Sequence, residues 1–245
     1  MTLCQAQLAS GDAKSAAESA RAARELAPAD QQAIALLATA QRLLGDPGYR
    51  QTADYDLVRT YRLEPPAPWR DLPGFLADLS AALGARHRLA GHPIGQSTRG
   101  GGEASLDPRF SQEPAIRAFF EAIRAPIDRH IAALGQGGAP FRIAGAWSVR
   151  LRPNGFHANH VHPRGWISSA FYVVVPAAVE DADNRAGWLK FGEPGPPTLP
   201  ALPPEHFVKP EPGLLALFPS HLWHGTVPFG GEEPRLSIAF DVVPA

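Results

Sequence analysis

Two short segments of the sequence gather five of its nine histidines. His157, His160 and His162 lie in NGFHANHVHP, and His221 and His224 lie in FPSHLWH. Side chains two residues apart share one face of an extended chain, so His160 and His162 can point the same way. His157 has the opposite parity and is expected to point elsewhere. Neutral imidazole binds iron, zinc and copper well, so the spacing predicts a metal site, with hydrogen-bonded histidines as the alternative.

Both histidine segments lie where apolar residues alternate along the chain. From Phe141 onward, short runs rich in β-branched and aromatic residues are separated by Gly and Pro, which is the pattern of antiparallel strands and turns. Several short strands at such spacing favour a sandwich or a jelly roll. The strands are expected at residues 141–151, 167–175, 187–192, 213–218 and 235–243.

The part of the chain before these strands is expected to be mostly helical. Of the 26 prolines only Pro28 and Pro47 precede residue 63, and proline is costly inside helices. Apolar residues at helical spacing predict one helix that ends at Ala27 and others over residues 30–44, 72–83 and 113–134, the last interrupted at Pro126.

The first two helices resemble part of a tetratricopeptide repeat. LASGDAKSAAESARAARELAPAD is similar to the second half of one repeat, and the helix behind it is similar to the first helix of the next. Such repeats need neighbours to bury their apolar faces, and only about one and a half are present. The alternative is an ordinary helical hairpin packed on the main domain.

Two stretches between the predicted elements have no clear periodicity. HPIGQSTRGGGEASL, residues 92–106, is glycine-rich, but no Lys-Ser/Thr follows the glycines, so we expect a mobile loop near a site rather than a phosphate-binding loop. Residues 193–212 contain eight prolines and few core residues. Connections of this length are often functional, and we expect a surface excursion that is a candidate lid.

Composition narrows the class of protein. With 44% hydrophobic residues among 245, the chain can form a core. The formal net charge is −1, so the chain lacks the excess of positive charge that binds nucleic acid or an anionic membrane. Neither is expected as a partner. The single cysteine, Cys4, excludes an internal disulfide framework and a multi-thiolate metal site. No secretory signal or membrane span is visible, which predicts a cytoplasmic protein.

Four motifs follow one another along the chain: His160-x-His162, the strand ending in Tyr172, Phe218-Pro219-Ser220-x-x-x-His224, and Arg235-x-Ser237. In this order they resemble the Fe(II)/2-oxoglutarate-dependent oxygenases, in particular a bacterial and phage subgroup related to prolyl hydroxylases. The lead-in of that subgroup is similar to the stretch from Asp54-Tyr55-Asp56-Leu57-Val58 through His92-Pro93-x-x-Gln96-Ser97-x-Arg99-Gly100. The resemblance covers about residues 50–245.

The resemblance implies a double-stranded β-helix, which is a jelly roll with iron between its two sheets. It assigns His160 and His224 as iron ligands, and Arg235 as the anchor of the distal carboxylate of 2-oxoglutarate through paired, charge-assisted hydrogen bonds. Ser237, on the same strand face as Arg235, and Tyr172, on a neighbouring strand, would add hydrogen bonds to that carboxylate.

The chain as a whole is therefore expected to be an α+β protein. Residues 1–48 would form a tetratricopeptide-like helical segment. Residues 49–245 would form a double-stranded β-helix oxygenase domain, with a helical lead-in over 49–138 and a jelly-roll core over 139–245.

His162 occupies the position where most of these enzymes have an Asp or Glu ligand. Asp181 and Asp183 are expected at the far end of the sheet, whereas Glu193 ends a returning strand and could replace the missing acid. The simplest interpretation is that His162 itself binds the metal, since His-x-His-Pro is usual in the subgroup. A three-histidine iron would keep more positive charge than one with a carboxylate ligand.

These observations predict an Fe(II)- and 2-oxoglutarate-dependent oxygenase that uses O₂ to hydroxylate a C–H bond of a peptide or protein side chain or of a small molecule. Two alternatives remain. A three-histidine iron in a β-barrel is also typical of cupin-type dioxygenases, which need no 2-oxoglutarate, and Arg235 discriminates between the two enzymes. The third interpretation is a non-catalytic helical-repeat binding protein with a degenerate oxygenase domain.

Overall fold

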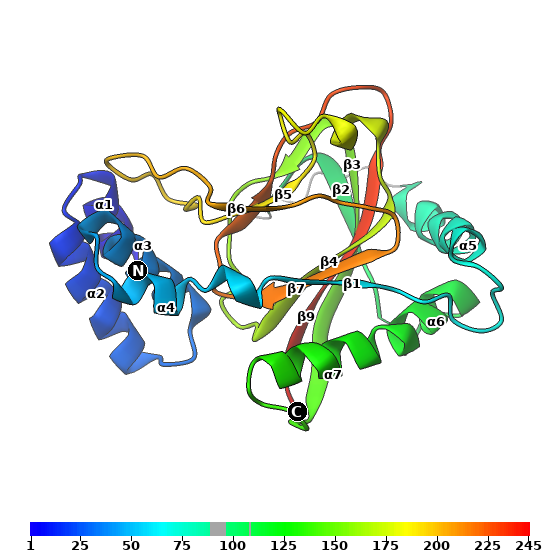
Figure 1. Ribbon diagram of the computed structural model, residues 1–245, viewed down its shortest axis with the longest axis horizontal. Coiled ribbons are helices and arrows are strands. Elements are labelled where there is room, and N and C mark those ends of the chain that lie inside the picture. The colour runs from blue at the N-terminus through cyan, green and yellow to red at the C-terminus, as the bar shows by residue number, and fades with distance from the viewer. Residues whose placement is uncertain (89–96, 108) are drawn as a thin grey trace.

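Two antiparallel sheets form the centre of the computed structural model, which describes residues 1–88, 97–107 and 109–245 (Figure 1). The larger sheet has the strand order β1-β7-β4-β9-β3-β2, and the smaller has the order β6-β5-β8. Leu189 of β5 and Phe218 of β7 belong to one apolar cluster, so the two sheets face each other as in a jelly roll. The strands are β1 (Arg59–Arg62), β2 (Thr98–Ser105), β3 (Phe141–His157), β4 (Ile167–Val174), β5 (Leu189–Phe191), β6 (His206–Val208), β7 (Leu214–Pro219), β8 (His224–Thr226) and β9 (Arg235–Pro244).

Strand alternation decides what each face of the larger sheet carries. In β4, Phe171 packs in the core beneath the helices, whereas Tyr172 belongs to the cluster between the sheets. The outer face is covered by α5 (Leu72–Gly84), α6 (Pro114–Ala122) and α7 (Arg124–Ala133). The inner face is therefore free to line a cavity against the smaller sheet.

The predicted helices and strands are found close to their expected positions, with local differences. β3 continues past residue 151 to His157. The break between α6 and α7 lies at Ile123, so its predicted place at Pro126 was wrong. Pro126 lies in the first turn of α7, where its missing N–H costs no helical hydrogen bond. Within the described part of the chain, no helix combines the length and apolar character needed to cross a bilayer.

The glycine-rich segment that was predicted to be a mobile loop is largely a strand. β2 pairs with β3 at the edge of the larger sheet, so the loop prediction was wrong for residues 98–105. A Cβ atom at Gly101 would lie 2.5 Å from the backbone oxygen of Arg150, so this close pairing requires glycine. The segment does lie near the site, because Ser97, Arg99 and Glu103 line the cavity between the sheets. The lead-in residues His92, Pro93 and Gln96 lie outside the described residues.

Helices at the start of the chain form a layer beside the jelly roll (Figure 1). They are α1 (Thr2–Ala9), α2 (Ala13–Leu26), α3 (Gln31–Leu44) and α4 (Gly48–Thr52). The side chains of Asp12 and Asp30 cap the N-termini of α2 and α3, and Gly45 ends α3 in the left-handed conformation. The first three helices share a core, rich in alanine, with Val161 and Trp223 of the jelly roll. This layer therefore packs directly on the residue that precedes His224.

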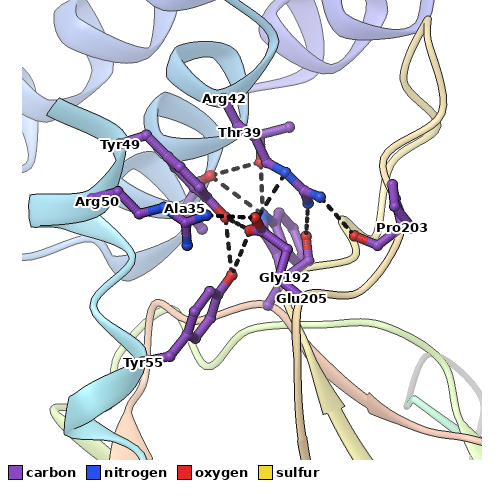
Figure 2. A network of polar contacts seen from close by, with 10 residues as sticks. Ala35, Thr39, Arg42, Tyr49, Arg50, Tyr55, Gly192, Pro203 and Glu205 are labelled. Atoms are coloured by element: carbon purple, nitrogen blue, oxygen red, sulfur yellow. Dashed lines mark hydrogen bonds and ion pairs between the residues drawn. The ribbon is translucent and has the colours of Figure 1, made fainter. Parts of the chain in front are cut away.

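The proline-rich segment 193–212 connects the helical layer to the sheets. Arg42 of α3 donates hydrogen bonds to the backbone oxygens of Gly192 and Pro203, at 2.8 and 2.9 Å. Glu205 accepts a hydrogen bond from Arg50 at 3.1 Å (Figure 2). No residue of this segment lines the cavity between the sheets. Gly195, Pro196 and Pro197 instead line a neighbouring pocket together with Asn159 and His160. The segment therefore attaches the helices and borders His160, and its role as a lid stays a prediction.

Candidate metal centre

A cavity of about 510 Å³ lies between the two sheets. Its wall combines residues of β3, β4 and β9 from the larger sheet with residues of β5 and β8 from the smaller one. All six residues that the sequence predicted for the site line this cavity: His160, His162, Tyr172, His224, Arg235 and Ser237. Residues far apart in the sequence are therefore brought to one place, as predicted.

The strands give this cavity two distinct ends. β8 begins with His224, which pairs with His160, and ends with Thr226, whose hydroxyl accepts a hydrogen bond from Arg235. β9 begins with Arg235 and passes behind His162 near its other end. The histidines therefore form one end of the cavity and Arg235 forms the other.

Three imidazoles converge at the histidine end. One ring nitrogen from each of His160, His162 and His224 lies within 4.8 Å of the other two. The Nε2 atoms of His160 and His162 are 3.2 Å apart. Two reciprocal backbone hydrogen bonds between His160 and His224, of 2.9 and 3.1 Å, fix these two residues relative to each other. Among the described residues this is the one cluster with the spacing of metal ligands.

The hydrogen bonds behind the rings assign the tautomer of each histidine. Nδ1 of His160 lies 2.8 Å from the backbone oxygen of Ala158, and Nδ1 of His224 lies 2.9 Å from that of Leu222. Nδ1 of His162 lies 2.7 Å from a carboxylate oxygen of Asp241. A carbonyl or carboxylate oxygen only accepts, so Nδ1 carries the proton in each ring and Nε2 keeps its lone pair. Three Nε2 lone pairs that lie close together can bind a metal cation.

Burial keeps the imidazoles of His160 and His224 neutral. It lowers the pKa of His160 to about 4 and lowers the pKa of His224 well below its ordinary value, and repulsion from the neighbouring rings adds to both shifts. The neutral form is the one that binds a metal ion. His160 and His224 can therefore bind a metal ion at neutral pH without the loss of a proton.

The opposite end of the cavity holds a buried positive charge. Arg235 is only 4% exposed, and it donates to the backbone oxygen of Gly187 at 3.0 Å and to the hydroxyl of Thr226 at 3.2 Å. Its Nε atom has no hydrogen-bond partner. No carboxylate of the described residues lies within 4.0 Å of its guanidinium group. A buried cation without an anion is costly, so this end of the cavity fits an anionic ligand.

Two predicted neighbours of Arg235 lie beside it. The guanidinium group of Arg235 is 5.6 Å from the centre of the Tyr172 ring, and the buried hydroxyl of Tyr172 has no partner. Ser237 is opposite Tyr172 in the pairing of β4 with β9 and is 5% exposed. Unpartnered Nε and hydroxyl groups beside one cavity are the donors that a carboxylate requires.

The acids that could have replaced His162 do not reach the cavity. Glu193 forms an ion pair with Lys190, Asp181 accepts a hydrogen bond from Asn184 in an exposed turn, and Asp183 is exposed. None of the three lines the cavity between the sheets.

Sequence reasoning missed Asp241, although a signal for it was present. Alternation along β9 puts residue 241 on the same face as Arg235 and Ser237, which were predicted. Its carboxylate lies directly behind His162. Strand alternation therefore indicates Asp241 as it indicates Ser237, although Asp241 lies outside the Arg-x-Ser motif.

The prediction that His157 points away from the site was wrong. His157 lines the cavity, its ring centre lies 5.9 Å from that of His160, and its Nδ1 lies 3.0 Å from the hydroxyl of Ser97. Regular alternation fails here because β3 ends at this residue and its pairing with β2 shifts register just before it. His221 instead contacts the helical layer, with Nε2 2.8 Å from the backbone oxygen of Thr52.

Solved structures of other proteins share this fold. A prolyl-4-hydroxylase from Pseudomonas putida has 20% sequence identity and a TM-score of 0.52 over 78% of this chain and 96% of that one. A collagen prolyl hydroxylase from Paramecium Bursaria Chlorella virus-1, solved with 2-oxoglutarate, has 11% identity and a TM-score of 0.51 over 79% and 99%. The α-ketoglutarate-dependent epimerase SnoN from nogalamycin biosynthesis has 18% identity and a TM-score of 0.52 over 79% and 81%. The fold is therefore the jelly roll of 2-oxoglutarate oxygenases.

The sequence itself matches one protein family. Residues 145–241 match the family described as "Putative 2OG-Fe(II) oxygenase". No curated protein matches the chain. The matched segment contains all six predicted site residues and Asp241. The matched segment is thus similar to an Fe(II)- and 2-oxoglutarate-dependent oxygenase domain, and the shared fold agrees with the predicted class.

Proposed function

We propose that this protein is an Fe(II)- and 2-oxoglutarate-dependent oxygenase in which His160, His162 and His224 hold the iron and Arg235 anchors the co-substrate. One observation carries the proposal: a single cavity has three convergent imidazoles at one end and a buried arginine without a carboxylate partner at the other. A divalent cation and a dicarboxylate together would complement both ends.

The protein's own residues bind and orient the co-substrate. Arg235 presents a rigid planar donor group, whose free Nε points to a carboxylate as its partner. The hydroxyl groups of Tyr172 and Ser237 add donors beside it. The buried apolar residues Leu189 and Phe218 line the same cavity, and such low-polarity walls strengthen each charge-assisted hydrogen bond. When bound, iron with 2-oxoglutarate and O₂ supplies the oxidising chemistry that acts on a C–H bond of the substrate.

The arginine end distinguishes this enzyme from the cupin-type alternative. A dioxygenase that uses no 2-oxoglutarate has no need for a buried cation that lacks an anionic partner, whereas Arg235 is buried in that state here. No observation on the histidine end favours a degenerate, metal-free domain, because all three Nδ1 atoms have acceptors that leave Nε2 available.

The outcome of the reaction is proposed to be hydroxylation of a peptide or protein side chain or of a small molecule. Two of the similar structures are titled prolyl hydroxylases, while a third is titled an epimerase. The same fold therefore hosts more than one outcome. Incubation with candidate peptides and small molecules, followed by mass spectrometry, tests the proposal through the gain of one oxygen atom.

We further propose that residues 1–48 form a tetratricopeptide-like segment attached to an oxygenase domain over residues 49–245, in the cytoplasm. Most residues of the alanine-rich core lie in the first three helices, which supports the division, and Val161 and Trp223 of the jelly roll complete that core. Trp223 donates a hydrogen bond to the Thr39 hydroxyl at 2.9 Å and Arg42 bonds to Pro203, so the segment is attached at several points (Figure 2).

The proposed function is tested by anaerobic addition of Fe(II) and 2-oxoglutarate. We expect a visible charge-transfer absorption that needs both additions, and we expect His224→Ala to abolish it. His206→Ala is a matched control, because His206 stacks on Tyr55 and does not line the cavity. Absence of the band in the natural protein, or an unchanged band in His224→Ala, would contradict the proposal.

A further inference from the structure

Asp241 is a partly buried carboxylate that contacts one of the three histidines. Its side chain is 13% exposed. One carboxylate oxygen, Oδ2, lies 2.7 Å from Nδ1 of His162. The other, Oδ1, accepts a hydrogen bond of 2.9 Å from the hydroxyl of Ser168 on the paired strand β4. Both oxygens of Asp241 are therefore engaged, and its orientation is fixed.

The hydrogen-bond chain continues behind Asp241. The hydroxyl groups of Ser168 and Ser220 lie 2.9 Å apart, and both residues are buried. The backbone oxygen of Ser220 accepts a hydrogen bond of 3.1 Å from the backbone N–H of His162. A Cβ atom at Gly165 would lie 2.3 Å from the hydroxyl of Ser220, so glycine lets the turn after His162 pack here. His162 is thus held through both its backbone and its ring.

His162 differs from the other two histidines in what holds its ring. The Nδ1 atoms of His160 and His224 donate to backbone carbonyl oxygens, whereas that of His162 donates to a carboxylate. His162 also occupies the position where an Asp or Glu ligand would otherwise stand. A carboxylate behind a ligating histidine fixes its tautomer and makes it a stronger donor to the metal.

We propose that Asp241 is a positioning residue that keeps Nε2 of His162 directed at the metal and supplies, one hydrogen bond away, the negative charge that the ligand set itself lacks. This inference rests on the proposed metal site. Three neutral imidazoles leave both positive charges of Fe(II) uncompensated at this end of the cavity, and Asp241 is the acid in contact with the cluster in the described structure. The hydrogen bond from Ser168 fixes the orientation of this carboxylate.

Cobalt(II) titration of the metal-free protein tests this role without any measurement of turnover. Asp241→Asn keeps the shape of the side chain and removes its charge, and we expect it to weaken Co(II) binding by roughly 10- to 100-fold. Ser168→Ala leaves the carboxylate in place but removes one hydrogen bond to it, and we expect a loss of roughly two- to tenfold. Asp181→Asn, an exposed acid outside the cavity, is the matched control and should bind Co(II) like the natural protein.

A spectroscopic signature separates positioning from a general loss of structure. In the Co(II)-loaded protein, NMR should show three hyperfine-shifted, exchangeable N–H signals, one from each Nδ1 of the three histidines. In Asp241→Asn loaded with excess Co(II), one of these signals should shift or exchange faster, while the other two stay. Circular dichroism and the thermal midpoint of the metal-free variants report their folding.

The outcomes distinguish this inference from the proposed function. Natural protein that binds no Co(II) would overturn both proposals. Tight Co(II) binding by the natural protein with equal affinity in folded Asp241→Asn, and three unchanged N–H signals, would overturn the role of Asp241 and leave the proposed function standing. Weaker binding in Asp241→Asn with one altered signal supports the role, even if 2-oxoglutarate has no effect on the protein.

Discussion

The two ends of the cavity present opposite kinds of polar group, acceptors at one end and donors at the other. At the histidine end, each Nδ1 has an acceptor behind it, and only lone pairs face inward. At the arginine end, Nε of Arg235 and the hydroxyl of Tyr172 are buried donors that have no partner. One end therefore offers acceptors to a cation, and the other offers donors to an anion. The cavity is therefore organised for two ligands of opposite charge, one at each end.

The means of support also differ between the two ends. The histidines are held by backbone bridges and by the Asp241 carboxylate, which fix ring orientation. Arg235 is held by Gly187 and Thr226 through its outer nitrogens, which leaves Nε free. Changes at one end should therefore affect the binding of one ligand far more than that of the other.

Arg235→Lys is expected to cause the largest loss of affinity for one ligand without a loss for the other. Lysine keeps the positive charge but cannot form the planar paired contact, so the affinity for 2-oxoglutarate should fall roughly 10- to 100-fold while Co(II) affinity stays within about twofold. Calorimetric titration with each ligand measures both values. Arg150→Lys, at an exposed position of β3, is the matched control. Equal losses of metal and 2-oxoglutarate affinity would break the distinction between the two ends.

A pH dependence of stability is expected from the histidine end. His160 has a pKa of about 4 in the folded protein, against about 6.5 in the unfolded chain. The unfolded chain therefore binds more protons between these values, so the stability of the metal-free protein is complete above about pH 6.5 and falls as the pH decreases toward 4. The slope is at most about 1.4 kcal/mol per pH unit for each such histidine.

Urea denaturation at pH 7 and pH 5 measures this slope. His224→Gln removes another histidine whose pKa is lowered by burial, so its slope should be shallower than that of the natural protein. Equal free energies of unfolding at pH 7 and pH 5 in the natural protein would show that the imidazoles are not held neutral by burial.

Tyr172→Phe should have effects of opposite sign on stability and on binding. The hydroxyl of Tyr172 is buried without a partner, so its removal should leave the free energy of unfolding unchanged or raise it by up to about 1 kcal/mol. The affinity for 2-oxoglutarate should fall severalfold, because a donor to the carboxylate is lost. Thermal unfolding and calorimetry check the two quantities. A large loss of stability would show that the hydroxyl has a structural partner.

The smallest effect on the cavity is expected from Glu205→Gln. Glu205 contacts Arg42 at 3.4 Å, Arg50 at 3.1 Å and the hydroxyl of Tyr55 at 3.2 Å, all outside the cavity (Figure 2). Loss of the charge should lower the free energy of unfolding by about 1–3 kcal/mol, with Co(II) and 2-oxoglutarate affinities unchanged. A marked loss of either affinity would mean that the helical layer holds the site in place.

Much of the fold follows from local patterns in the sequence. Period-two runs of β-branched and aromatic residues predicted β3, β4, β7 and β9, because those strands bury at least one face. β1 and β2 were missed because an exposed edge strand, or one rich in glycine, carries no such alternation. The contacts of segment 193–212 with the helical layer were also missed, since they join the side chains of Arg42 and Arg50 to residues more than 150 positions away in the sequence.

Site residues could be predicted where both the spacing of a motif and the alternation along a strand placed them in the cavity. His160, His162 and Arg235 satisfied both. His157 was misplaced because β3 ends at that residue, after a register shift in its pairing that parity cannot anticipate. Asp241 lies on the same face of β9 as Arg235, as alternation predicts, but it belongs to no recognised motif. Tertiary packing therefore decided the position of His157, whereas alternation along β9 was sufficient to place Asp241.

The central claim is that the cavity binds a metal at its histidine end and a carboxylate at its arginine end. A crystal structure with Mn(II) and an unreactive 2-oxoglutarate analogue tests it most directly. We predict anomalous density for the metal bonded to Nε2 of His160, His162 and His224, with the distal carboxylate of the analogue hydrogen-bonded to Nε of Arg235. Metal bound by Asp241 or Glu193 in place of His162, or a carboxylate away from Arg235, would contradict the account.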